Sequence, residues 1–204
     1  HGIQLQYQFL VIFYILEKKM KYHSTRNKKI NLEFKQIFQR GLAPDGGLFI
    51  PKKIKRFSKK DLKKLEKLNY VDLTVEIISS FCHPTFKKKQ IKKIVKKSYY
   101  RFKNKEVVNL IKVGKYNLLE LYLGPTLAFK DIAMQCIGTI YEEFNKKTDL
   151  PTNIVVATSG DTGSAAISAL NNCKNIKVFV LHPHNKISKI QRKIMTTIGS
   201  KNIY

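Results

Sequence analysis

Lys130 lies where the chain is expected to pass from a strand into a helix, and its amine could act as a nucleophile. Alternating residues over 118–123 predict a short strand that Gly124-Pro125 ends, because proline has no N–H to donate to a sheet. From Ile132 onward apolar residues recur at helical spacing, which predicts a helix capped by Thr126. A helix N-terminus disfavours an ammonium ion by about 0.3–1 kcal/mol, and a neutral lysine amine can form Schiff bases. The alternative is a surface lysine whose charge reaches water along its flexible stem.

The turn at 158–163 is the second candidate site. It follows a predicted strand and precedes a predicted helix, and it contains Gly160 and Gly163. Exposed N–H groups at a helix start bind anions, and glycines let a ligand approach closely. The turn fits neither of the glycine-rich nucleotide motifs G-x-x-x-x-G-K-[ST] and G-x-G-x-x-G. The alternative is that its polar side chains only cap the helix, namely Ser159, Asp161 and Thr162.

The composition is that of a globular chain with a large excess of lysine. At 204 residues the chain is long enough for one full domain or one and a half. Its hydrophobic fraction of 43% is typical of a globular protein, and its net charge is +25. Only five of the 39 basic residues are arginine, whereas nucleic-acid surfaces usually depend on the paired donors of the guanidinium group. We therefore expect solvated lysine-rich faces and no nucleic-acid partner. A non-enzymatic basic nucleic-acid-binding protein is the alternative class.

The cysteines indicate a reducing compartment. Cys82, Cys136 and Cys173 are odd in number, widely spaced and set in apolar patterns, so we expect free core thiols in a cytoplasmic protein. Cys82-His83 lacks a second pair of ligands at metal-binding spacing, so no metal site is expected.

Residues 1–19 differ from the rest of the chain. Their apolar run, 9–16, is much shorter than the roughly 20 residues that span a bilayer, and neither the basic region nor the cleavage site of a secretory signal accompanies it. We expect a non-native or unstructured leader, with Met20 as the natural start and no membrane partner. A peripheral membrane hook is the alternative.

The sequence predicts two domains after this leader. Residues 20–105 predict a mostly helical module, with a capping box at Ser58 and Asp61. Its helices are expected at 32–40, 58–68, around 73–81 and 86–98. Residues 106–204 alternate strands and helices, which predicts an α/β fold with an incomplete parallel sheet, flanking helices and ligands at the carboxyl ends of the strands. Its later strands are expected at 153–158, buried on both faces, and at 176–181.

Several motifs, in the same order, resemble those of threonine synthases. They are Met20-Lys21-Tyr22-x-Ser24-Thr25-Arg26, Gly41-Leu42-Ala43-x-Asp45-Gly46-Gly47-Leu48, Gly124-Pro125-Thr126-Leu127-Ala128-Phe129-Lys130-Asp131, Ala157-Thr158-Ser159-Gly160-Asp161-Thr162-Gly163-Ser164-Ala165-Ala166, Pro183-His184-Asn185-Lys186-Ile187-Ser188-x-x-Gln191 and Met195-Thr196-Thr197. The resemblance runs from Met20 to Tyr204 and covers less than half of a typical family member.

This resemblance implies a pyridoxal-phosphate enzyme of the tryptophan-synthase-β-like fold (fold type II). The family converts O-phospho-L-homoserine and water to L-threonine and phosphate. Lys130 matches the catalytic lysine that binds the cofactor as a Schiff base. The segment Thr158, Ser159, Gly160, Asp161 and Thr162 matches the loop that holds the substrate carboxylate, and Asp161 matches a residue that faces the cofactor ring. Leu123 departs from the family, since many members have His there.

Part of the family's site is expected beyond Tyr204. The glycine-rich loop around the cofactor phosphate and the hydroxyl at the pyridine nitrogen have no counterpart in residues 20–204, so the resemblance implies an N-terminal fragment that is inactive alone. Another fold-type-II lyase or dehydratase, acting on a hydroxy or phospho amino acid, is the alternative enzyme.

Overall fold

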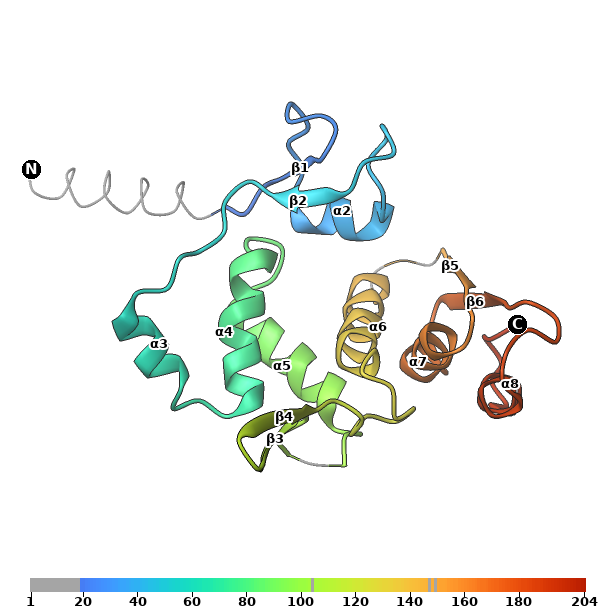
Figure 1. Ribbon diagram of the computed structural model, residues 1–204. Coiled ribbons are helices and arrows are strands. Elements are labelled where there is room, and N and C mark those ends of the chain that lie inside the picture. Colours follow the sequence, from blue (N-terminus) through green and yellow to red (C-terminus); the bar gives the residue numbers. More distant parts are fainter. Residues whose placement is uncertain (1–18, 104, 147, 149) are drawn as a thin grey trace, which may run out of the picture. The chain divides into compact units, whose positions relative to one another are not determined.

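The computed structural model describes residues 19–103, 105–146, 148 and 150–204 (Figure 1). The predicted leader, apart from Lys19, lies outside the described residues. The chain divides into two compact units, one ending at Lys92 and the other beginning at Lys93, within helix α5 (Lys88–Tyr99). The domain boundary after residue 105 stays a prediction from the sequence, and each unit is described by itself below.

The first unit combines the predicted helices with a small sheet. Strands β1 (Tyr22–Ser24) and β2 (Phe49–Pro51) pair antiparallel, and helix α2 (Phe34–Arg40) lies between them in the chain. The sequence did not predict this sheet, because strands of three residues are too short to show alternation.

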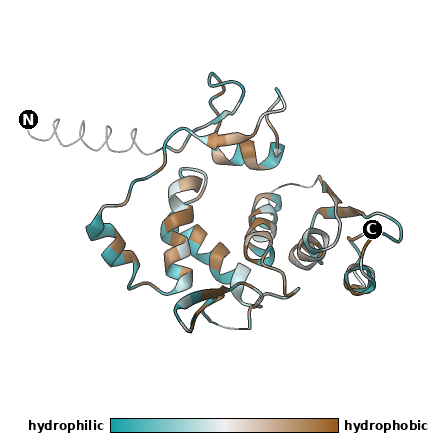
Figure 2. Cartoon of the chain, in the orientation of Figure 1, coloured by the Kyte–Doolittle hydropathy of each residue, from teal (hydrophilic) through white to brown (hydrophobic). Residues whose placement is uncertain are grey.

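The remaining helices of this unit begin where polar caps place them. In α3 (Lys59–Leu65) the backbone N–H of Asp61 donates to Ser58 Oγ at 3.1 Å, so the predicted capping box is confirmed, although the helix ends before Leu68. Asn69 caps α4 (Tyr70–Cys82), which ends before Pro84 as expected. Figure 2 shows hydrophobic and hydrophilic residues side by side along α4 and α5. The buried residues of α5 are the apolar Ile91, Ile94, Val95 and Tyr99, together with Ser98.

The second unit begins its sheet structure with a hairpin. Strands β3 (Asn109–Val113) and β4 (Tyr116–Glu120) pair antiparallel across the two-residue turn Gly114-Lys115. The predicted strand at 118–123 therefore begins two residues earlier and ends at Glu120, and its partner is antiparallel. Strand β3, and with it the hairpin, was not predicted from the sequence.

Strand–helix alternation is confirmed in the rest of this unit. Its helices are α6 (Asp131–Asn145), α7 (Asp161–Leu170) and α8 (Lys189–Thr196). Strands β5 (Thr152–Ala157) and β6 (Ile176–Leu181) pair in parallel, and Ile203 continues the pairing through a parallel bridge to Val178.

Burial of β5 on both faces was a wrong expectation. Its side chains alternate between half-buried and exposed. Ile154 and Val156 pack on a core that contains Leu170 and Val178, whereas the Val155 side chain on the other face is 64% exposed. The continuous β-branched run in the sequence conceals this two-sided character.

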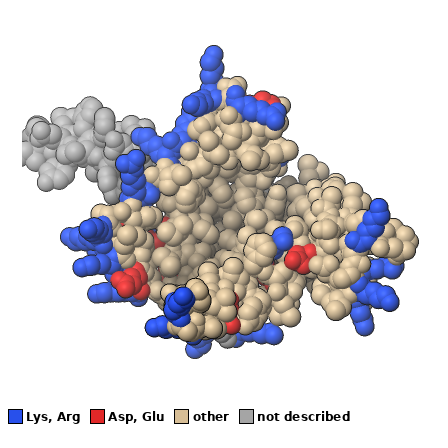
Figure 3. All heavy atoms as spheres, in the orientation of Figure 1, with Lys and Arg blue, Asp and Glu red and all other residues tan. Residues whose placement is uncertain are grey.

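Basic side chains are spread over many elements of the face drawn in Figure 3. Several lysines lie beside acidic residues, as in the pairs Lys21–Glu33 at 2.9 Å, Lys92–Asp72 at 2.8 Å and Lys97–Glu142 at 2.6 Å. None of the described helices has the length and apolar character needed to cross a bilayer.

Candidate active site

The loop that leads into α6 is held by a buried carboxylate. Asp131, the first residue of α6, is fully buried and accepts hydrogen bonds from the Thr126 backbone N–H at 2.7 Å and from Thr126 Oγ1 at 2.8 Å. A carboxylate is favoured at a helix N-terminus, where the backbone carries partial positive charge. A side chain on Gly124 would overlap that of Asp131. The Asp131 carboxylate therefore holds the residues from Gly124 to Thr126 against the start of α6.

This arrangement places Lys130 at the amino end of α6. Lys130 itself is the N-cap residue, so the prediction that Thr126 caps the helix was wrong: Thr126 binds Asp131 instead. The Lys130 side chain is 32% exposed, and its Nζ lies 4.5 Å from the centre of the Phe129 ring and 3.9 Å from Asp161 Oδ2. The amine is thus accessible, and it has one acidic neighbour at a distance longer than a hydrogen bond.

The turn before α7 is closed by Thr158. Its Oγ1 accepts from the N–H groups of Gly160 at 3.0 Å and Gly163 at 2.9 Å. Gly160 is the N-cap residue of α7, with a φ of 148° that other residues rarely adopt, and no side chain caps the helix from this position. The capping alternative thus applies to Thr158 and not to the three residues named for it.

Two side chains of the turn remain available to a ligand. The hydroxyl groups of Ser159 and Thr162 make no hydrogen bond to any described residue, and the backbone N–H groups of Asp161 and Thr162 donate to none either. Unpaired N–H groups are normal in the first turn of a helix and suit an anion such as a carboxylate.

Helix α8 contributes a residue that the sequence analysis did not assign to the site. Gln191 Nε2 donates to Asp161 Oδ1 at 3.0 Å. The same amide packs on Gly160, where any side chain would overlap it. Its position three residues after Ser188 was visible in the sequence, but the contact with Asp161 spans 30 residues and leaves no local signal.

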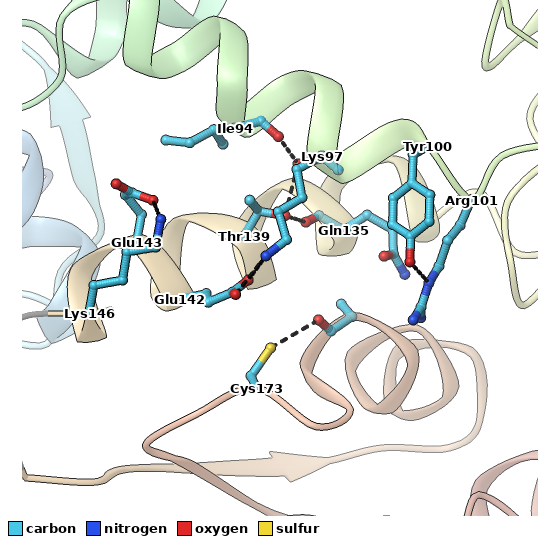
Figure 4. A network of polar contacts seen from close by, with 12 residues as sticks. Ile94, Lys97, Tyr100, Arg101, Gln135, Thr139, Glu142, Glu143, Lys146 and Cys173 are labelled. Atoms are coloured by element: carbon cyan, nitrogen blue, oxygen red, sulfur yellow. Dashed lines mark hydrogen bonds and ion pairs between the residues drawn. The ribbon is translucent and has the colours of Figure 1, made fainter.

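Polar contacts hold α6 to its neighbours behind the site (Figure 4). Ser98 Oγ donates to Thr139 Oγ1 at 3.1 Å, and Thr139 Oγ1 donates to the Gln135 carbonyl oxygen at 2.9 Å. Gln135 Nε2 in turn donates to Ser168 Oγ of α7 at 3.2 Å. Because Gln135 and Ser168 are both buried, this contact fixes α6 against α7 and hence the amino ends that carry Lys130 and Asp161.

The thiols of this unit are poor candidates for chemistry. Burial raises the pKa of Cys136 and that of Cys173 to about 11, so both thiols stay neutral near pH 7. None of the three cysteines forms a disulfide. Within the described part of the chain, no group of three or more His, Cys, Asp or Glu side chains could hold a metal ion.

Comparison with known proteins identifies relatives of this arrangement. Residues 21–99 match the family model described as "Threonine synthase N terminus". Threonine synthase of Pseudomonas aeruginosa is 39% identical over 186 residues, which make up 91% of this chain and 40% of that protein. The resemblance to threonine synthases is confirmed. Threonine synthase-like 2 of Xenopus laevis is 36% identical over 187 residues, again 91% of this chain and 40% of the relative.

Solved threonine synthases share the fold. The PLP-bound threonine synthase of Brucella melitensis matches with a TM-score of 0.84 and 34% identity over 91% of this chain and 40% of that one. The yeast threonine synthase matches with a TM-score of 0.84, 37% identity and the same coverage. The predicted α/β class, with parallel strands and flanking helices, is thereby confirmed. The chain spans about 40% of the length of these relatives.

Leu123, where many threonine synthases have His, comes directly before the loop that leads from Gly124 into α6. Leu123 is buried, with 8% of its surface exposed, and its carbonyl oxygen accepts from the Lys103 N–H at 3.1 Å. An apolar residue there is thus part of the packing that precedes Gly124.

Proposed function

We propose that the protein carrying this chain is a pyridoxal-phosphate-dependent threonine synthase. This carbon–oxygen lyase would convert O-phospho-L-homoserine and water to L-threonine and phosphate, the last step of threonine biosynthesis. The observation that carries the proposal is the accessible Lys130 amine beside Asp161, in a chain whose fold is that of the PLP-bound Brucella enzyme. Lys130 and the turn that follows β5 lie in the segments whose sequence resembles motifs of threonine synthases.

The residues present fit the cofactor in their chemistry. Pyridoxal phosphate carries an aldehyde, which reacts with an accessible primary amine. The ion pair between the Lys130 amine and Asp161, at 3.9 Å, is longer than a hydrogen bond. Lys130 would hold the cofactor through Nζ, and Asp161 would face the ring.

When bound, the cofactor supplies an electron sink for carbanion chemistry. The chain's own residues would orient the substrate and move its protons. The N–H groups of Asp161 and Thr162, together with the hydroxyl groups of Ser159 and Thr162, would bind the substrate carboxylate. Lys130 Nζ would take and return protons beside the reacting carbons, since a lysine side chain can act as a general acid and base.

We also propose a small-molecule enzyme of the cytoplasm, with neither a nucleic-acid nor a membrane partner. Three cysteines without a disulfide between them support a reducing compartment. The lysines paired with carboxylates, and the small number of arginines, support solvated surfaces rather than a phosphate-binding one. A steep fall of nucleic-acid binding with salt would contradict this part of the proposal.

The test is a product assay on the longest protein that the coding region yields. Incubation with O-phospho-L-homoserine and pyridoxal phosphate should release phosphate and threonine in equal amounts. Release of 2-oxobutyrate without threonine would instead support a lyase or dehydratase of the same fold. This outcome needs its own measurement because the relatives include proteins named threonine synthase-like 2 as well as threonine synthases.

A further inference from the structure

The two oxygens of the Asp161 carboxylate contact residues of two different helices. Its Oδ1 accepts from Gln191 Nε2 of α8 at 3.0 Å, while its Oδ2 lies 3.9 Å from Lys130 Nζ of α6. The first distance is that of a hydrogen bond and the second is longer than one. The Asp161 side chain is half exposed, so packing alone does not fix it.

Gln191 is itself held in one orientation. Its Oε1 accepts from Ser188 Oγ at 3.1 Å, and its backbone N–H donates to the same hydroxyl oxygen at 3.2 Å. Since a carboxylate can only accept, the nitrogen of the amide must face Asp161 and the oxygen must face Ser188. The amide also packs on Gly160, which is the residue before Asp161.

We infer that Gln191 is a positioning residue of the proposed site, one that restrains the Asp161 carboxylate and keeps it from closing on the Lys130 amine. Closure of the carboxylate to hydrogen-bond distance would strengthen the ion pair between the two groups and favour the ammonium form, which has no nucleophilic lone pair. By binding Oδ1, Gln191 holds the carboxylate in an ion pair with the amine at 3.9 Å and keeps it from closing to hydrogen-bond distance. This inference rests on the proposed role of Lys130, and it adds the device that leaves the amine reactive.

The alternative is that Gln191 only caps α8. Two other glutamines hold the corresponding place in their helices and show what a capping role looks like. Gln36 Oε1 accepts from the Glu33 N–H at 2.9 Å, and Gln90 Oε1 accepts from the Lys87 N–H at 2.8 Å. Both reach back to a backbone N–H, as in a capping box. Gln191 Oε1 bonds a hydroxyl group instead, and its nitrogen bonds a different helix.

The experiment compares the reactivity of the Lys130 amine among variants of the intact protein without cofactor. Trace labelling with acetic anhydride at pH 8, followed by mass spectrometry, gives the acylation rate of Lys130 relative to other lysines. In Gln191→Met, which keeps the shape but loses the donor, we expect acylation about two- to fivefold slower, the range of an exposed ion pair. Gln191→Asn, whose shorter amide does not reach Asp161, should behave alike and guards against misfolding of the first variant.

Two controls make the result specific. Gln90→Met removes a capping glutamine elsewhere and should leave Lys130 acylation unchanged. Adding Asp161→Asn to Gln191→Met removes the charge that closes on the amine, so acylation should return to the wild-type rate or exceed it. Equal rates in wild type and both Gln191 variants, or slow acylation that persists in the double variant, would overturn the inference.

The same protein separates this inference from the proposed function. Addition of pyridoxal phosphate, borohydride reduction and peptide mapping report whether wild-type Lys130 takes the cofactor. A wild-type protein that takes none would overturn the proposed function, although the acylation comparison would still stand. If wild-type Lys130 takes up the cofactor but its acylation rate is the same in the Gln191 variants, only the positioning role of Gln191 would be overturned.

Discussion

Two aspartates occupy the same place in two helices and have opposite surroundings. Asp131 opens α6 and Asp161 opens α7. Asp131 is fully buried and bonded twice by Thr126, five residues away in its own loop. Asp161 is half exposed, and its partners come from elsewhere in the chain, Gln191 of α8 and Lys130 of α6. The first carboxylate builds a loop, whereas the second is free to take part in chemistry.

The difference shows that a charge at a helix start acquires its role from burial rather than from position. Both residues benefit from the helix dipole. Only Asp131 satisfies its hydrogen bonds locally, so its loss would break the loop that presents Lys130. Asp161 depends on contacts that other segments provide, so its loss would change the electrostatics of the amine and leave the fold intact.

The largest expected effect concerns Lys130, the residue between these two carboxylates. In the longest protein that the coding region yields, Lys130→Ala should lower kcat/KM by about a thousandfold or more, or about 4 kcal/mol, because a covalent partner is lost. The matched control is Lys146→Ala at the other end of α6, which removes a surface pair with Glu143 and should leave turnover near the wild-type value. Turnover that survives Lys130→Ala would remove the residue from the mechanism.

Stability measurements test whether the two aspartates contribute differently to the free energy of unfolding. Asp131→Ala should cost about 3 kcal/mol in the free energy of unfolding, because two charge-assisted hydrogen bonds disappear and Thr126 loses its buried partner. Asp161→Ala should change that free energy by no more than about 0.5 kcal/mol, as at other exposed positions. Urea unfolding of both variants decides between them. Similar losses would show that the two carboxylates do the same structural work.

The sequence predicts much of the fold that carries these residues. Strand 176–181 and the capping box at Ser58 and Asp61 were located from local signals alone, since strand composition and helix caps act within a few residues. The hairpin β3–β4 was missed because an alternating run does not reveal the direction of its partner. The exposed face of β5 was missed because β-branched residues suit both buried and half-buried strands.

The site was only partly predictable for the same reason. Lys130 and the turn at 158–163 stand out through local chemistry, and the structure brings the Lys130 amine to Asp161. The roles of Asp131 and Gln191 depend on burial and on contacts between helices, which no short motif encodes. From the sequence both residues were quoted only within the motifs that resemble threonine synthases, and neither was assigned a role.

A substitution of Gly160, the residue before Asp161, tests the contacts that surround the Asp161 carboxylate. Gly160→Val should cost about 2 kcal/mol in stability, because its φ of 148° is strained for a side chain. The variant should also weaken substrate binding, because the side chain would displace the Gln191 amide. Gly199 has open space around its Cα, so Gly199→Val serves as the control with little effect on binding. Melting curves read beside substrate titrations test both parts, and unchanged binding in Gly160→Val would show that substrate binding does not depend on the position of the Gln191 amide.

The smallest expected effect separates the two threonines of the turn. Thr158→Ala should cost about 1 kcal/mol of stability, because Thr158 Oγ1 accepts the two N–H groups that close the turn. Thr162→Ala should leave stability unchanged, because its hydroxyl group bonds no described residue. If that hydroxyl group binds the substrate carboxylate, Thr162→Ala should weaken substrate affinity about tenfold, the low end for a hydrogen bond to a charged group, since the backbone donors persist. Substrate titration of the full-length enzyme is the measurement. A Thr162→Ala variant with lowered stability and unchanged affinity would make Thr162 a structural residue like Thr158, and the carboxylate would then depend on backbone N–H groups alone.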